Sequence, residues 1–187
     1  MLQADNSLGM AVIMGMAGVG KTELALQYGR SHQDTYQGGV IHLPAANFGE
    51  ALRNWMQVEF YCDRDLRHLP ELTQQVAPGW KEWQNYCGTH RQALVIIDDV
   101  TDYRRQVAPF LPQDAPSFRF LLTSRLRIVS PTPIPTLELK VLEPESAIAM
   151  LSRYVGEQRI NADRQRLKLF ADAWAIYRLP LISSDVG

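Results

Sequence analysis

Short apolar runs alternate with longer stretches of helical spacing along most of this chain. Each apolar run is brief enough for one strand and is rich in the aliphatic and β-branched residues that strands favour. Strands are predicted at residues 11–14, 39–43, 93–98, 118–123 and 136–141. Helices are predicted at residues 21–31, 48–61, 78–88, 103–110 and 144–155. Because strands that alternate with helices are typical of a parallel sheet covered on both faces, we expect an α/β fold.

The run from Leu94 to Ile97 is apolar without interruption. A strand with apolar side chains on both faces is expected at the centre of such a sheet. Residues 62–77 mix charges with a proline and predict a loop with a helical turn or two. The prolines within residues 130–135 predict an extended loop before the last strand.

The pattern changes near the C-terminal end of the chain. The helix predicted at residues 144–155 is followed by a second one at 162–177, with no strand between them. Two successive helices indicate the start of a helical subdomain. We therefore predict an α/β domain at residues 1–142 and a partial helical subdomain at residues 143–187.

Residues 15–22 read Gly-Met-Ala-Gly-Val-Gly-Lys-Thr and match the phosphate-binding pattern G-x-x-x-x-G-K-[ST] at every fixed position. A predicted strand precedes them and a predicted helix follows, which is the setting that the pattern requires. The glycines let backbone N–H groups point at phosphate oxygens, and the helix N-terminus adds partial positive charge. Lys21 would bind the β- and γ-phosphates, and the Thr22 hydroxyl would bind Mg²⁺. The residues expected to bind nucleotide here are Gly15, Ala17, Gly18, Val19, Gly20, Lys21, Thr22 and Glu23. The alternative is a tight glycine turn without a ligand, which the match and its setting together disfavour.

Asp98 and Asp99 follow the central apolar strand. Asp98 would hold Mg²⁺, mostly through water, because Mg²⁺ sheds its water reluctantly. Asp99 would orient, and act as base for, the water that attacks the γ-phosphate. Taken alone, the pair fits equally well two aspartates that make local turns. The phosphate loop upstream favours the catalytic interpretation.

Thr123, Ser124 and Arg125 end the next predicted strand and bring two hydroxyls and a guanidinium to the same edge of the sheet. Ligands of open α/β sheets bind at that edge. Arg125 would donate to the γ-phosphate and so distinguish ATP from ADP. Arg127 is a second candidate for this role, and a surface arginine without a ligand is the alternative.

Composition narrows the class of protein. The formal net charge is −1 over 187 residues, which gives no sign of a nucleic-acid-binding or membrane-surface protein. The two cysteines form no C-x-x-C pair and fit free thiols in a reducing cytoplasm. The apolar stretch at residues 8–20 is too short to span a bilayer and ends in the phosphate loop. We expect a cytoplasmic protein.

Taken together, these motifs resemble the NB-ARC type of STAND nucleotide-binding domain, a class of signal-transduction ATPases. The resemblance rests on the phosphate loop, on Asp98 and Asp99, and on the Thr-Ser-Arg segment. Three further segments fit the spacing of the family: Phe110-Leu111-Pro112, Leu142-Glu143-Pro144-Glu145-Ser146-Ala147 and Leu179-Pro180-Leu181. The resemblance implies a P-loop NTPase sandwich of three layers around a parallel five-stranded sheet of order 5-1-4-3-2.

The resemblance also implies a function. The chain would bind ATP and ADP, hydrolyse ATP slowly with Mg²⁺ and act as a nucleotide switch in a signalling or regulatory protein. Pro180 would pack near the adenine, although Arg178 stands where the family has glycine. The chain ends soon after this motif, so we expect the core of a larger protein. Expected partners are the adenine nucleotide, other domains or proteins, and further copies in a nucleotide-dependent oligomer.

Two other functions stay open at this point. A small-molecule kinase also uses a phosphate loop, but it usually carries an arginine-rich lid and an acceptor pocket, and the sequence shows no such lid. A module that keeps ADP bound without hydrolysis would carry the same motifs and would differ in turnover alone.

Overall fold

The computed structural model of the protein describes residues 9–60, 69–112, 116–156, 166 and 168–169. The chain divides into two units, Met1–Leu139 and Lys140–Gly187, and each is described by itself. Among the described residues, the first unit contains the sheet and helices α1 to α4. The second contains α5 (Pro144–Val155), which begins on a proline at its first turn and ends before Gly156.

The sheet has five strands in the order β2-β3-β4-β1-β5. Every adjacent pair is parallel, so all the strands end at the same edge. Read from the other side, this is the predicted order 5-1-4-3-2, which is confirmed. The strands are β1 (Met10–Met14), β2 (Gly39–Pro44), β3 (Ala93–Val100), β4 (Phe118–Ser124) and β5 (Thr136–Glu138).

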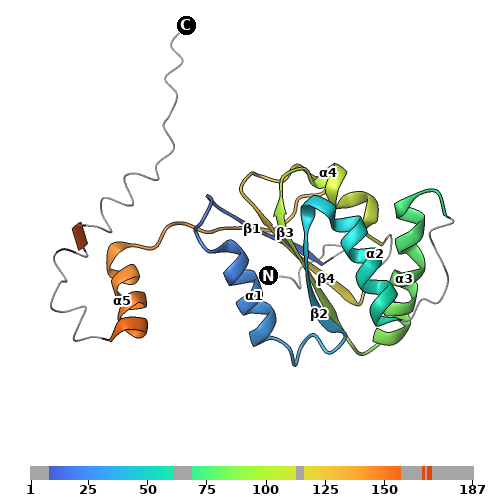
Figure 1. Ribbon diagram of the computed structural model, residues 1–187, viewed down its shortest axis with the longest axis horizontal. Coiled ribbons are helices and arrows are strands. Elements are labelled where there is room, and N and C mark those ends of the chain that lie inside the picture. Colours follow the sequence, from blue (N-terminus) through green and yellow to red (C-terminus); the bar gives the residue numbers. More distant parts are fainter. Residues whose placement is uncertain (1–8, 61–68, 113–115, 157–165, 167, 170–187) are drawn as a thin grey trace, which may run out of the picture. The chain divides into compact units, whose positions relative to one another are not determined.

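Helices cover both faces of this sheet, as Figure 1 shows, with α1 on one side and α2 and α3 on the other. Alternate residues of β3 serve the two faces, because successive side chains of a strand point in opposite directions. Val95 and Ile97 belong to the buried cluster under α2 and α3, whereas Leu94 and Ile96 belong to the cluster under α1. The helices are α1 (Lys21–Ser31), α2 (Phe48–Glu59), α3 (Leu72–Cys87) and α4 (Tyr103–Gln106). The predicted three-layer α/β architecture is confirmed.

Helix α3 begins earlier than the sequence predicts. It starts at Leu72, so Pro78 lies inside it rather than at its first turn. Proline removes one backbone hydrogen bond from a helix. The turn before it is nevertheless held, because Val76 is buried against the core. Packing of this turn outweighs the proline, and the predicted start at residue 78 is wrong.

Two other predicted boundaries are corrected. The helix expected at residues 103–110 is α4 followed by a 3-10 turn at Ala108–Phe110. Pro109 has no N–H to donate, so the α-helical hydrogen bonding stops there. The last strand ends at Glu138 instead of residue 141. After Leu139, whose N–H still donates to the Met14 carbonyl at 2.7 Å, the chain leaves the sheet.

The tryptophans of the described residues pack in the core, as expected from their helical positions. Trp80 and Trp83 stack with ring centroids 5.6 Å apart, and the ring of Phe118 lies 4.9 Å from each of them. Trp83 is fully buried and donates its indole N–H to the Gly38 carbonyl at 2.8 Å. Within the described ranges, no helix is long and apolar enough to cross a membrane.

Candidate functional site

The phosphate loop begins at Gly15, directly after β1, between the ends of β4 and β5. The Gly15 N–H donates to the Ser124 carbonyl at 3.2 Å. A Cβ on Gly15 would lie 2.5 Å from the Leu139 carbonyl oxygen, closer than real contacts allow. Glycine is therefore required here by the close approach of the neighbouring backbone.

The loop ends at Gly20, which adopts a left-handed conformation with φ of 102° before α1 begins. Leu24 makes the first hydrogen bond of the helix, from its N–H to the Gly20 carbonyl. Gly20 precedes α1 and has no side chain that could cap the N-terminus of the helix with a hydrogen bond. The first N–H groups of the helix can therefore bind an anion, and the helix dipole favours one there.

Lys21 is buried at the start of α1, with 8% of its surface exposed. Its Nζ donates to the Met16 carbonyl at 2.9 Å, so the side chain folds back across the loop. An ammonium group has three donors, and the two others can serve phosphate oxygens. The geometry puts a positive charge inside the loop.

The Asp98 carboxylate connects the end of the phosphate loop to the sheet. Its Oδ1 accepts a hydrogen bond from the Thr22 hydroxyl at 2.7 Å and another from the Thr123 hydroxyl at 2.6 Å. Since Thr22 donates its proton to the carboxylate, the lone pairs of Thr22 Oγ1 are what it can offer a metal ion. A hydroxyl and a carboxylate oxygen are the hard ligands that Mg²⁺ prefers, with phosphate oxygens and waters completing its shell.

Asp98 and Asp99 lie together in a β-bulge of β3. Ile97 pairs with Leu122 and Val100 pairs with Ser124, so two residues of β3 stand opposite Thr123 alone. Bulges of this kind redirect a side chain and are frequent beside active sites. Asp99 has a positive φ of 56°, and its N–H donates to Thr123 Oγ1 at 2.9 Å. The side chains of these two adjacent aspartates therefore lie in different surroundings.

Asp99 is paired with Arg125. The Arg125 Nε lies 3.1 Å from Asp99 Oδ1, and the Nη2 lies 3.2 Å from Oδ2. The pair is bidentate and about half exposed on both sides. Sequence reasoning assigned Asp99 to the attacking water and Arg125 to the γ-phosphate, and did not predict that the two residues bind each other. Adjacent ends of β3 and β4 could have suggested it, once the strand order was predicted.

The structure brings most of the predicted site residues to one edge of the sheet. The phosphate loop, Thr22, Asp98, Asp99 and Arg125 lie there together. Glu23 is exposed and forms an ion pair of 3.6 Å with Arg30, also on α1. Pro180 lies outside the described residues, as do Arg178 and most of the helix predicted at 162–177.

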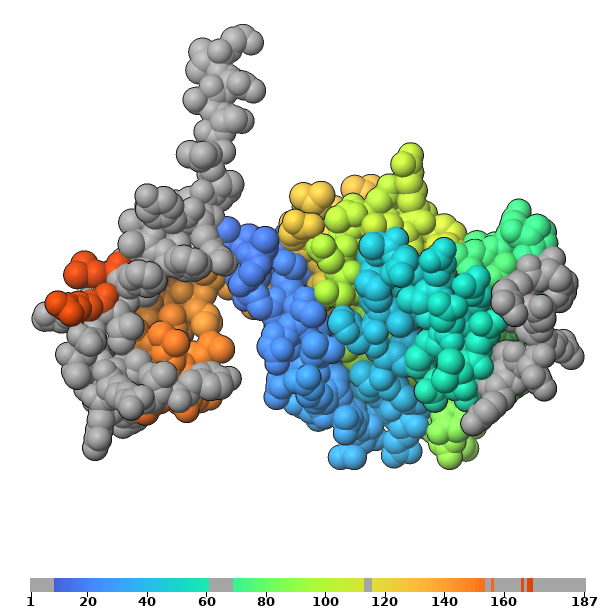
Figure 2. All heavy atoms as spheres, in the orientation of Figure 1, coloured from blue at the N-terminus to red at the C-terminus, as the bar shows by residue number. Residues whose placement is uncertain are grey.

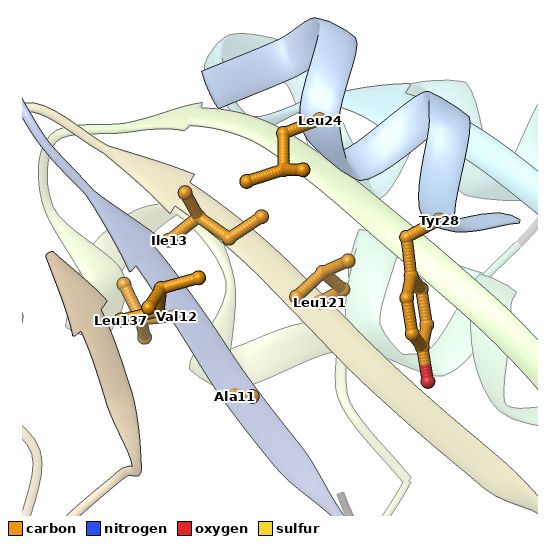
Figure 3. Close-up of a pocket in the computed structure, with 7 residues that line it drawn as sticks. All are labelled: Ala11, Val12, Ile13, Leu24, Tyr28, Leu121 and Leu137. Carbon is orange, nitrogen blue, oxygen red and sulfur yellow. The ribbon is translucent and has the colours of Figure 1, made fainter. Parts of the chain in front are cut away.

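A separate apolar pocket lies beside α1, on the face of the sheet opposite α2 and α3 (Figure 3). It has a volume of about 210 Å³, and the hydroxyl of Tyr28 is the one polar side-chain group among the residues drawn. Its lining residues are Ala11, Val12, Ile13, Leu24, Tyr28, Leu121 and Leu137. No local pattern in the sequence predicts this pocket, because its lining comes from four elements.

Known proteins resemble this chain in sequence. A family model described as the NB-ARC domain matches residues 1–161. The regulatory protein AfsR of Streptomyces coelicolor is 26% identical over 169 residues, and that of Streptomyces griseus is 25% identical over the same length. Each alignment covers 84% of this chain and 16% of the relative, so the chain spans a small part of those proteins.

Solved structures also match parts of this chain. The structure of Drosophila ORC bound to DNA has a TM-score of 0.57 at 16% identity, over 90% of this chain and 48% of that one. A STAND protein with a tetratricopeptide repeat sensor from Pyrococcus horikoshii has a TM-score of 0.49 at 20% identity, over 79% and 23%. The likeness to ORC is one of fold alone and agrees with the parallel sheet described above.

Proposed function

Because the chain belongs to the NB-ARC domain family, we propose that it binds ATP and ADP with Mg²⁺, hydrolyses ATP slowly and serves as the nucleotide switch of a larger regulatory protein in the cytoplasm. The observation that supports this most is the hydrogen bond of 2.7 Å between Thr22 and Asp98. It brings together, from segments 76 residues apart, a hydroxyl and a carboxylate that would hold Mg²⁺. A glycine turn without a ligand has no need of this link.

In this proposal each part of the loop has its own task. The N–H groups from Gly18 to Thr22 bind the phosphates, and buried Lys21 neutralises the β- and γ-phosphates. Thr22 and Asp98 hold Mg²⁺, which would draw negative charge from the phosphate oxygens when bound. Asp99 orients water, and Arg125 donates to the γ-phosphate.

The test is calorimetry with ATP and ADP in the presence and absence of Mg²⁺. Lys21→Ala should lower the affinity for ATP by about ten- to a hundredfold, since a charge-assisted contact is worth about 1.5–3 kcal/mol. Lys81→Ala, at an exposed position of α3, is the matched control and should leave the affinity unchanged. Equal affinities for wild type and Lys21→Ala would contradict the proposal.

One observation favours a second function, a module that keeps ADP without hydrolysis. The carboxylate proposed to orient water is bound on both oxygens by Arg125. A protein in which this pair persists with ATP bound would not turn over. Release of phosphate from ATP, measured over hours against the Asp99→Ala variant, distinguishes the two functions.

A further inference from the structure

We propose that Asp99 and Arg125 form a latch, in which Arg125 can bind a γ-phosphate after it has released Asp99. The inference rests on the proposed function and adds a regulation to it. The Arg125 guanidinium would bind either the Asp99 carboxylate or the γ-phosphate. When it binds the γ-phosphate of ATP, it would release the carboxylate that orients water.

Asp99 is the fixed half of the latch. It lies in the β-bulge of β3, and its N–H is held by Thr123 Oγ1 at 2.9 Å. Thr123 is itself buried, with 1% of its surface exposed, and its proton is donated to Asp98. This chain of hydrogen bonds fixes the backbone from which the Asp99 carboxylate extends.

Arg125 is the moving half. It follows the end of β4, and half of its side-chain surface is exposed. The long arginine side chain can change rotamer without displacing a packed neighbour. The phosphate loop begins beside the same strand end, because the Gly15 N–H binds the carbonyl of Ser124, the residue before Arg125. The backbone at Arg125 therefore lies next to the start of the phosphate loop, while its guanidinium binds Asp99.

The two acceptors exclude each other. Both Arg125 nitrogens that face Asp99 are engaged in the bidentate pair, at 3.1 and 3.2 Å. A γ-phosphate needs the same planar fork, since bidentate binding is how arginine recognises phosphate and carboxylate alike. With ADP no competing acceptor is present, and the pair stays closed. The pair thus lowers the affinity for ATP and leaves the affinity for ADP alone.

The experiment is a double-mutant cycle with binding as the readout. A non-hydrolysable ATP analogue and ADP, each with Mg²⁺, are titrated into wild type, Asp99→Asn, Arg125→Ala and the double variant. Asparagine keeps the shape of aspartate and tolerates a positive φ. We expect Asp99→Asn to tighten binding of the ATP analogue about two- to fivefold, the range that half-exposed ion pairs give, and to leave ADP binding unchanged. In the Arg125→Ala background the same substitution should have no effect.

Arg127→Ala provides the matched control, because Arg127 lies on the same loop and was the other candidate for the sensing role. The effect of Asp99→Asn should persist in that background. Asp99→Gly, which relaxes the left-handed backbone, gives the same test if Asp99→Asn fails to fold.

Three results would overturn the latch. One is tighter ATP-analogue binding in the Arg125→Ala background as well, which would show direct repulsion between Asp99 and the phosphate. Another is loss of the effect with Arg127→Ala instead of Arg125→Ala. The third is normal binding of both nucleotides with no effect of Asp99→Asn. Failure of the wild-type protein to bind either nucleotide would overturn the proposed function itself, and the latch with it.

Discussion

The two faces of the sheet are packed very differently. Under α2 and α3, Trp80, Trp83 and Phe118 form the centre of a large buried cluster that also takes in residues from β1 to β4. Under α1 the buried cluster is smaller, and part of that face is open as the apolar pocket. Figure 2 shows α1 (blue) and α2 (cyan) both exposed at the surface of the first unit. The closely packed face stabilises the fold, whereas the lightly packed face holds the helix that begins at the phosphate loop.

The largest expected effect comes from the packed face. Trp83→Ala removes a fully buried indole and its hydrogen bond to Gly38, and should lower the free energy of unfolding by about 3–5 kcal/mol. Chemical denaturation measures it. Tyr86→Ala, one turn along α3 at a half-exposed position, should cost less than about 1 kcal/mol. Similar losses for the two variants would mean that the aromatic cluster is not the main support of the fold.

A pair of neighbours on β3 sharpens the comparison. Ile96 and Ile97 are both buried but belong to opposite faces of the sheet. Ile97→Ala should fall near the upper end of the usual 2–5 kcal/mol, and Ile96→Ala near the lower end, because α1 has fewer close neighbours and can settle toward the sheet. Denaturation midpoints of the two variants give the difference. The reverse order would show that α1 is held as tightly as α2 and α3.

Thr123→Val tests the edge of the sheet at which the strands end and the candidate site lies. The substitution keeps the size of the side chain but removes a buried hydroxyl that donates to Asp98 and accepts from the Asp99 N–H. We expect the free energy of unfolding to fall by about 1–2 kcal/mol. We also expect the loss of nucleotide affinity, relative to wild type, to be larger with Mg²⁺ than without it. Denaturation and calorimetry measure these. Ser124→Ala is the comparison, since its hydroxyl lies 2.6 Å from the Val100 carbonyl and not at the aspartates.

The smallest expected effect depends on pH. Burial raises the pKa of the Cys87 thiol, so the folded protein keeps that proton at a pH at which the unfolded chain loses it. The stabilisation is complete below the unfolded pKa and is lost as the pH rises above it, which places the loss in the alkaline range. Denaturation of wild type and Cys87→Ala between pH 7 and 10 should show a steeper decline for wild type. Parallel declines would contradict it.

Much of the fold followed from local patterns. The apolar run of β3 and the phosphate loop each carry their signal within a few consecutive residues, and the sheet order came with the family resemblance. The helix start at Leu72 was missed because the burial of Val76 depends on a neighbouring helix and outweighs Pro78. Packing between elements is not visible in a local pattern.

The candidate site was predictable as a set of residues but not as an arrangement. The positions of Lys21, Thr22 and Asp98 follow from their motifs, because each motif ends at the same edge of a parallel sheet. The pairing of Asp99 with Arg125 depends on the β-bulge, and a bulge is a one-residue offset between two strands. Nothing within either strand's own sequence determines that offset.

The way the chain leaves the sheet has a mechanical consequence. β5 is a short edge strand whose residues are exposed, and it is followed at once by Leu139. The Leu139 N–H binds the Met14 carbonyl at 2.7 Å, and its own carbonyl abuts Gly15. A pull on the polypeptide beyond this residue reaches the first glycine of the loop through a single hydrogen bond. A force on the chain beyond Leu139 would therefore act directly on Gly15, where the phosphate loop begins.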